Sequence, residues 1–255
     1  MIDQLVCVET SHMQALFKVL KSEEPWVWDE EPLCSRDIRR LSLVNLRLRV
    51  VESIILPFHL LTHLNLSFNR LTEIFGLSHL VSLKLLDISH NRIAELTPVK
   101  NMTELETLRC DHNCHIDKLE SIFYLTKLKH LSVSHNRINW EESVFLMPLH
   151  GLESLNLLEN PLLVEKPKFW EFLGAIKPLL KFLNGIRKDQ IESSSSFSFS
   201  SSIGGGGSQV GGHMNNDFLR TSDGRIMLTQ ARAYFSASSL GRYLIFPSLL
   251  YRRPI

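Results

Sequence analysis

Residues 108–116, LRCDHNCHI, hold two cysteines and two histidines within six positions. Cys110, His112, Cys114 and His115 all carry side chains that zinc accepts as ligands. A group of this kind makes a metal site the first hypothesis for the segment. Whether the four side chains can meet at one ion depends on the elements that carry them.

The same segment belongs to a pattern that recurs along the chain, L-x-x-L-x-L-x-x-N. Five copies begin at Leu61, Leu83, Leu105, Leu128 and Leu152, and Ile38 opens a weaker first copy. The copies follow one another every 22 to 24 residues. They end in Asn69, Asn91, Asn113, Asn136 and Asn160, whereas the first copy has Leu46. A period of this length is typical of stacked repeats.

Residues 37 to 185 resemble the intracellular 22-residue subclass of leucine-rich repeats. The resemblance implies an α/β solenoid with one parallel sheet on its concave face, short helical or 3-10 returns, and a cap at each end. The residues alone predict the same architecture, because the alternation of Leu64 and Leu66 indicates a short strand with one buried face. The spacing of Ile74, Leu77 and Leu80 then fits a tight helical return. One unit cannot bury its apolar face alone, so the units must stack.

The repeat favours a structural interpretation of the cysteines and histidines. Cys110 takes the inward position that other copies fill with Leu66, Ile88, Val133 and Leu157, so we expect it to be buried. His112 falls on the outer side, and Cys114 and His115 follow the asparagine, where this copy has one extra residue. We therefore expect no metal here. The repeated asparagines are expected to form an internal ladder that pairs turn amides.

Composition divides the chain into five parts. Residues 1–36 are predicted to be a helical N-terminal cap, although the helix expected over 11–24 could instead be an exposed recognition helix. Residues 37–160 are the repeats and 161–192 a C-terminal cap. Residues 193–214 are an uncharged serine- and glycine-rich linker. The GGGGS and HM sequences resemble an engineered fusion linker, with a native low-complexity linker as the alternative.

Residues 215–255 are predicted to be a segment of a second protein that is tethered as a partner. They contain six arginines and two aspartates, a net charge of +4, so the remaining residues sum to −3 within a whole-chain charge of +1. Opposite charges favour association. The expected apolar anchors of this segment are Tyr234, Phe235, Tyr243, Leu244, Ile245 and Phe246.

The outward strand positions should form columns of side chains across the concave face. The predicted partner-binding residues are Arg40, His63, Asn65, Phe68, Leu85, Asp87, His90, Arg109, His112, His130, His135 and Leu158. Phe68, Leu85 and Leu158 are the expected apolar anchors. Histidines stacked at strand spacing could bind metal or respond to pH, but a consensus structural role is favoured.

The sequence predicts a protein-interaction scaffold that binds a short basic, apolar segment, because no enzyme motif is evident. Two alternatives remain, a spliceosomal-type ribonucleoprotein subunit and a regulatory subunit of a phosphatase or prenyltransferase. We expect no catalytic residue, no cofactor, no direct nucleic-acid or membrane contact, and a monomeric body. Four scattered cysteines and the absence of a long apolar run favour an intracellular location, cytoplasmic or nuclear.

Overall fold

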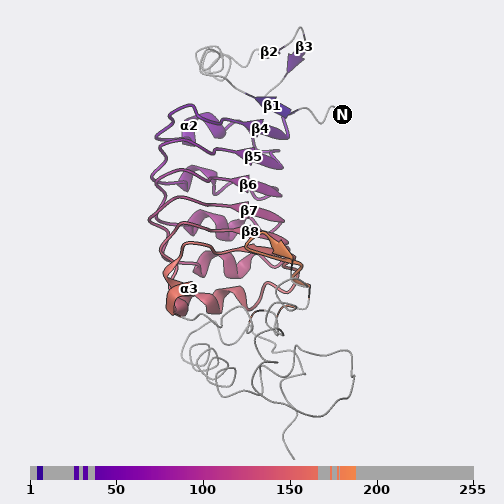
Figure 1. Cartoon of the computed structure of the whole chain (residues 1–255). Coiled ribbons are helices and arrows are strands. Elements are labelled where there is room, and N and C mark those ends of the chain that lie inside the picture. Colours follow the sequence, from indigo (N-terminus) through magenta and orange to yellow (C-terminus); the bar gives the residue numbers. More distant parts are fainter. Residues whose placement is uncertain are drawn as a thin grey trace, which may run out of the picture.

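The computed structural model describes residues 5–7, 26–28, 31–33, 38–165, 173, 177 and 179–187. The helix expected over 11–24, the linker 193–214 and the tail 215–255 with its anchors lie outside them. The main element is a nine-stranded sheet with the strand order β1-β4-β5-β6-β7-β8-β9-β10-β11. Its strands stack one above another along the molecule (Figure 1).

Each repeat contributes one strand of three residues. The strands of the repeats are β4 Arg40–Ser42, β5 His63–Asn65, β6 Leu85–Asp87, β7 Thr107–Arg109, β8 His130–Ser132 and β9 Ser154–Asn156. They pair in parallel with equivalent positions side by side, as Leu41 with Leu64 and Leu64 with Leu86. This one-strand-per-repeat stacking confirms the predicted α/β solenoid.

Strands outside the repeats extend the sheet at both ends. β1 (Leu5–Cys7) pairs in parallel with β4, and β10 (Phe182–Leu183) pairs in parallel with β9. β11 (Ile186–Arg187) then closes that end as an antiparallel partner of β10. A separate two-stranded antiparallel sheet joins β2 (Trp26–Trp28) to β3 (Glu31–Leu33). The sequence patterns did not single out β1, β2 or β3 as strands.

Short helices return the chain on the side opposite the strands (Figure 1). They are α2 Glu52–Ile55, η3 Phe75–Leu77, η4 Thr97–Asn101, η5 Glu120–Tyr124, η6 Trp140–Leu146 and α3 Pro161–Glu165. The four η elements are 3-10 helices, as predicted. Gly76 lets η3 approach α2, because a Cβ there would lie 2.6 Å from the Glu52 Cα. None of the described helices is long and apolar enough to cross a membrane.

One continuous apolar core lies between the strands and the returns. Leu64, Leu66 and Cys110 are all fully buried in it. Burial raises the pKa of the Cys110 thiol well above its usual range, and nearby carboxylates raise it further. The thiol contacts the Ser132 carbonyl oxygen at 3.5 Å. The predicted burial of Cys110 is therefore confirmed.

The Cys110→Val substitution is expected to change the free energy of unfolding by less than about 1.5 kcal/mol, because valine has a similar volume and fits an apolar slot. Urea denaturation of both proteins measures the difference. A loss of several kcal/mol would show that the thiol makes an essential polar contact.

The predicted asparagine ladder is present. The Asn91 side-chain amide donates to the carbonyl oxygens of Leu66, Ile88 and Ser89 at 3.0–3.2 Å. Its oxygen accepts a hydrogen bond from the Leu71 backbone amide at 3.0 Å. One buried side chain thereby pairs backbone groups of its own repeat and of the preceding one.

Asn136 departs from this pattern. Its amide donates to the carbonyl oxygens of Cys110, Val133 and Ser134, but its buried Oδ1 has no hydrogen-bond partner. In the other repeats, the ladder asparagine accepts a hydrogen bond from a backbone amide of the preceding turn. The donor is the residue two positions after the preceding asparagine: Leu71 for Asn91, Ile93 for Asn113 and Ile138 for Asn160. The extra residue in the 114–115 turn shifts that donor, and so Asn136 lacks its partner.

A buried lysine closes the C-terminal end of the repeats. Lys177 is 1% exposed and donates from Nζ to the carbonyl oxygens of Met147 at 2.7 Å and Leu149 at 3.0 Å. Both carbonyls lie just after η6, and the Leu149 carbonyl also accepts from the Leu152 backbone amide at 3.2 Å. Burial lowers the pKa of Lys177 from 10.5 to about 7.

The lowered pKa of Lys177 predicts a pH-dependent stability. Between pH 7 and the unfolded pKa, the unfolded chain binds the proton more tightly than the folded chain, so stability should rise with pH by up to about 1.4 kcal/mol per unit. Denaturation at pH 7.5, 8.5 and 9.5 measures this slope. In Lys177→Met the rise should be absent, and equal slopes in the two proteins would contradict the assignment.

Candidate partner-binding face

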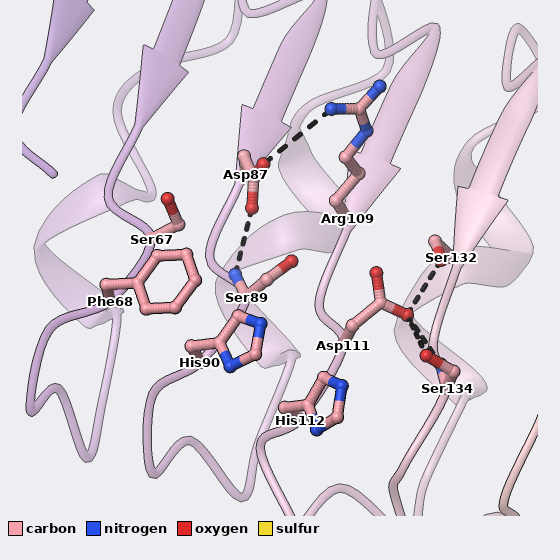
Figure 2. Close-up of a pocket in the computed structure, with 10 residues that line it drawn as sticks. All are labelled: Ser67, Phe68, Asp87, Ser89, His90, Arg109, Asp111, His112, Ser132 and Ser134. Carbon is pink, nitrogen blue, oxygen red and sulfur yellow. Dashed lines mark hydrogen bonds and ion pairs between the residues drawn. The ribbon is translucent and has the colours of Figure 1, made fainter.

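A hollow of about 410 Å³ lies on the open face of the sheet, the face that points away from the core (Figure 2). Its walls come from the ends of β6 to β8 and from the residues just after β5 to β8. The lining residues are Ser67, Phe68, Asp87, Ser89, His90, Arg109, Asp111, His112, Ser132 and Ser134. Equivalent positions of successive repeats thus form one continuous surface.

Four aromatic rings form a stack along one side of the hollow. The ring centroids are 4.1 Å apart between Phe68 and His90, 4.4 Å between His90 and His112, and 3.9 Å between His112 and His135. The rings are nearly parallel, with interplanar angles of 11–14°. They cover one another's faces, so the stack presents mainly ring edges to a partner.

The backbone explains why histidine occupies this column. Phe68, His90, His112 and His135 all have positive φ angles of 53–58°. Histidine is several-fold enriched in this left-handed region, whereas a bulky residue such as phenylalanine is unusual there. Each residue also donates its backbone amide to the next repeat, as His90 does to the Asp111 carbonyl oxygen at 2.8 Å. The column is fixed by sheet pairing.

The environment of His112 favours its uncharged form. Burial lowers the pKa of His112 from its usual 6.5, and the neighbouring His135 and His90 lower it further. Asp111 acts in the opposite direction but is the weakest of these influences. The hollow therefore gains no positive charge from His112 at pH 7.

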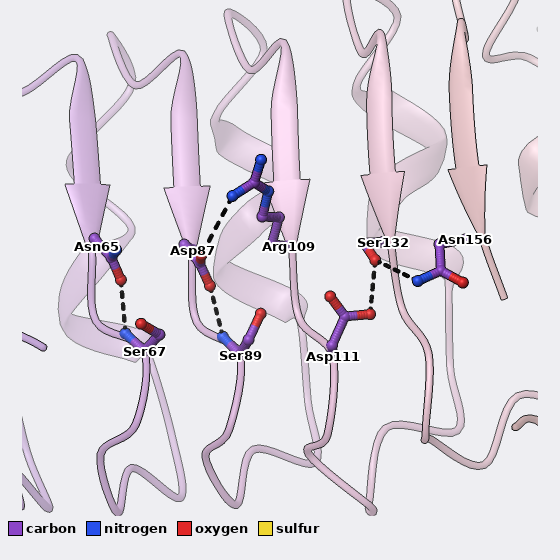
Figure 3. A network of polar contacts seen from close by, with 8 residues as sticks. All are labelled: Asn65, Ser67, Asp87, Ser89, Arg109, Asp111, Ser132 and Asn156. Carbon is purple, nitrogen blue, oxygen red and sulfur yellow. Dashed lines mark hydrogen bonds and ion pairs between the residues drawn. The ribbon is translucent and has the colours of Figure 1, made fainter. Parts of the chain in front are cut away.

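A carboxylate on the floor of the hollow is held rigidly. Asp111 Oδ1 accepts hydrogen bonds from the Ser132 hydroxyl at 2.7 Å, the Ser134 hydroxyl at 2.6 Å and the Ser134 backbone amide at 2.7 Å. Asn156 donates in turn to the Ser132 hydroxyl oxygen at 3.1 Å (Figure 3). This network runs across three repeats and orients the Asp111 side chain.

The second carboxylate is partly neutralised. Asp87 Oδ1 accepts from the Ser89 backbone amide at 3.0 Å, and Oδ2 lies 3.9 Å from an Arg109 guanidinium nitrogen (Figure 3). Asn65 makes the equivalent turn contact in its own repeat, to the Ser67 amide at 2.9 Å. Two carboxylates against one guanidinium leave the hollow with a net negative charge.

The structure brings only some of the predicted partner-binding residues together. Five of them, Phe68, Asp87, His90, Arg109 and His112, line the hollow. Arg40, His63, Leu85 and His130 lie at the starts of their strands, and His135 and Leu158 are exposed farther along the same face. Asn65 lies beside the hollow and supports it through Ser67.

Sequence reasoning missed one column of the site, Ser67, Ser89, Asp111 and Ser134. It lies two residues after each strand and contributes four of the ten lining residues. One signal was available in the sequence, because Asp111 stands where three of the other repeats have serine. A charged residue that breaks a consensus on a surface column is a candidate for binding.

The histidine and cysteine side chains of residues 108–116 do not converge on a metal position. Within the described ranges, no group of three or more histidine, cysteine, aspartate or glutamate side chains is placed to hold an ion. Cys110 is buried in the core, whereas Cys114 is exposed. The two cysteines of the 108–116 segment thus lie in different environments.

Comparison with known proteins supports the repeat assignment. A family model described as two copies of leucine-rich repeats matches residues 59–101 and, again, residues 81–124. A comparison with curated protein sequences finds no match.

Three solved structures are similar to part of this chain. An internalin (inlF) of Listeria monocytogenes has a TM-score of 0.50 at 22% identity, over 58% of this chain and 41% of that one. A leucine-rich repeat protein of Leptospira interrogans has a TM-score of 0.48 at 27% identity, over 58% and 43%. The ectodomain of an Arabidopsis thaliana receptor kinase, in complex with CASPARIAN STRIP INTEGRITY FACTOR 2, has a TM-score of 0.48 at 22% identity, over 58% and 18%.

This chain spans less than two thirds of the length of each of these proteins. The likeness to the internalin concerns the fold alone. Together with the family match and the one-strand-per-repeat sheet, it identifies residues 38–165 as a leucine-rich repeat solenoid.

Proposed function

We propose that the chain is a protein-interaction scaffold whose open sheet face binds a short basic, apolar segment of a partner protein. The observation that carries the proposal is the hollow of about 410 Å³, which combines aromatic rings, fixed carboxylates and hydroxyl groups. Rigid aromatic groups with polar neighbours are typical of energetically important contact sites. The proposal assigns no catalytic step to the chain.

Residues 215–255 are the proposed example of such a segment. Their net charge of +4 complements the −3 of the residues before the linker. The 22-residue linker has a random-coil reach of about 25 Å, close to the width of five or six strands at about 4.8 Å each. Tethering raises the effective concentration of the segment, so weak contacts suffice for docking.

An intracellular location is part of this proposal. Cys110 and Cys114 are both free thiols, which fits a reducing compartment. Fractionation of cells that produce the full chain, followed by immunodetection, tests the location.

Photo-cross-linking of the full chain tests where the segment docks. Phe68 on the open face and Phe75 in η3, on the opposite side, are each 53% exposed. A benzophenone side chain at position 68 should cross-link to residues 215–255, whereas the same group at position 75 should do so at least tenfold less. Equal yields at the two positions, or no such product from position 68, would contradict the proposal.

A further inference from the structure

The geometry points to Asp111 as the anchor for a cationic side chain, and we propose that Arg225, Arg232 or Arg242 of residues 215–255 binds there. This inference rests on the proposed function, because it specifies the chemistry of the same face. It goes further by assigning one residue, outside the predicted set, to the recognition of charge.

The two oxygens of Asp111 are used differently. Oδ1 accepts three hydrogen bonds from Ser132 and Ser134, at 2.6–2.7 Å. Within the part of the chain that the structure describes, no donor reaches Oδ2, which points into the hollow (Figure 2). The carboxylate is thereby oriented in advance and keeps one oxygen for an incoming donor, which limits the entropy lost on binding.

The surroundings favour a cation over an anion. Asp87 and Asp111 outweigh Arg109 by one charge, and His112 is neutral at pH 7. Arg109 is already directed to Asp87, at 3.9 Å, so it reduces the charge of that residue rather than that of Asp111. Hydrogen bonds between a cationic donor and a carboxylate are among the stronger polar contacts.

The tail supplies the matching chemistry. Residues 215–255 contain six arginines and no lysine. In the sequence, Arg225 and Arg232 precede the first expected anchors of the tail and Arg242 falls between the two groups of anchors, so these three arginines are the candidates to reach Asp111. A guanidinium group presents five donors and can contact Asp111 Oδ2 and a neighbouring hydroxyl oxygen together.

The test measures cross-linking from position 68 to residues 215–255 in the full chain. Asp111→Asn keeps an oxygen for Ser132 and Ser134 but replaces the free carboxylate oxygen with an amide, and the yield should fall at least fivefold. The yield of the Asp111→Ser variant should fall equally. This variant should fold, because serine fills this position in three other repeats. Asp117→Asn, at an exposed position outside the hollow, is the control and should keep the original yield.

Glutamine substitutions at Arg225, Arg232 and Arg242, one at a time, identify the partner of Asp111. One of them should reproduce the fivefold loss and add no further loss when combined with Asp111→Asn, as expected for two groups in contact. Unchanged yields in both Asp111 variants, or in all three arginine variants, would overturn the inference. The difference in cross-linking yield between positions 68 and 75 would still test the proposed function separately.

Discussion

Replacement of Asn113 by leucine is expected to lower the free energy of unfolding by about 2–3 kcal/mol. The Asn113 amide donates to the carbonyl oxygens of Ile88 and Cys110 at 3.2 and 3.0 Å, and its oxygen accepts from the Ile93 backbone amide at 3.0 Å. Leucine cannot make these contacts, and the backbone groups would stay buried without partners. Urea denaturation monitored by circular dichroism measures the loss.

Asn136→Leu is the matched control for this prediction. Both asparagines occupy the same ladder position, but Asn136 Oδ1 has no partner in the native protein. Its replacement should therefore cost about 1 kcal/mol less than that of Asn113. Equal losses would show that the amide acceptor bond contributes little to the stability of the ladder.

Deletion of Cys114 is expected to raise the free energy of unfolding by about 1–2 kcal/mol. In the other turns the next apolar residue lies two positions after the asparagine, and the deletion restores this spacing between Asn113 and Ile116. Asn136 Oδ1 should then gain a backbone amide donor. It also removes a residue with a φ of 61°, a conformation that is strained for side chains other than glycine. Thermal and urea denaturation of the two proteins measure the gain.

Deletion of Arg92 provides the comparison, because its turn already has the two-residue spacing. That deletion should be destabilising, since it displaces Ile93 from Asn113. A Cys114 deletion that is as destabilising as the Arg92 deletion would mean that the extra residue is required by the fold.

The repeating part of the fold could be predicted from the sequence because the buried positions recur with the same period as the sequence repeat. Leu64, Leu86 and Leu108 occupy the same inward position of their repeats, and the asparagines occupy the same turn position. The role assigned to a position in one repeat is therefore supported by the other repeats. The same frame placed Cys110 in the core. It also placed Phe68 and the histidines in one column, although the close ring stacking depends on positive φ angles that no spacing reveals.

The features that were missed depend on contacts between distant residues. β1 pairs with β4 across more than thirty residues, and Lys177 reaches Met147 from a position after the last repeat. Neither contact repeats along the chain, so periodicity carries no signal for them. Asp111 was overlooked for a different reason, because its importance comes from the serines of the following repeat.

Calorimetric titration of a peptide of residues 215–255 into a chain that ends at residue 192 tests most directly whether the open face is a binding surface. We predict saturable heat with a dissociation constant in the micromolar range, and at least fivefold weaker binding to the Asp111→Asn variant of the same shortened chain. No detectable heat at high micromolar concentrations, with both proteins folded by circular dichroism, would contradict the proposed scaffold function.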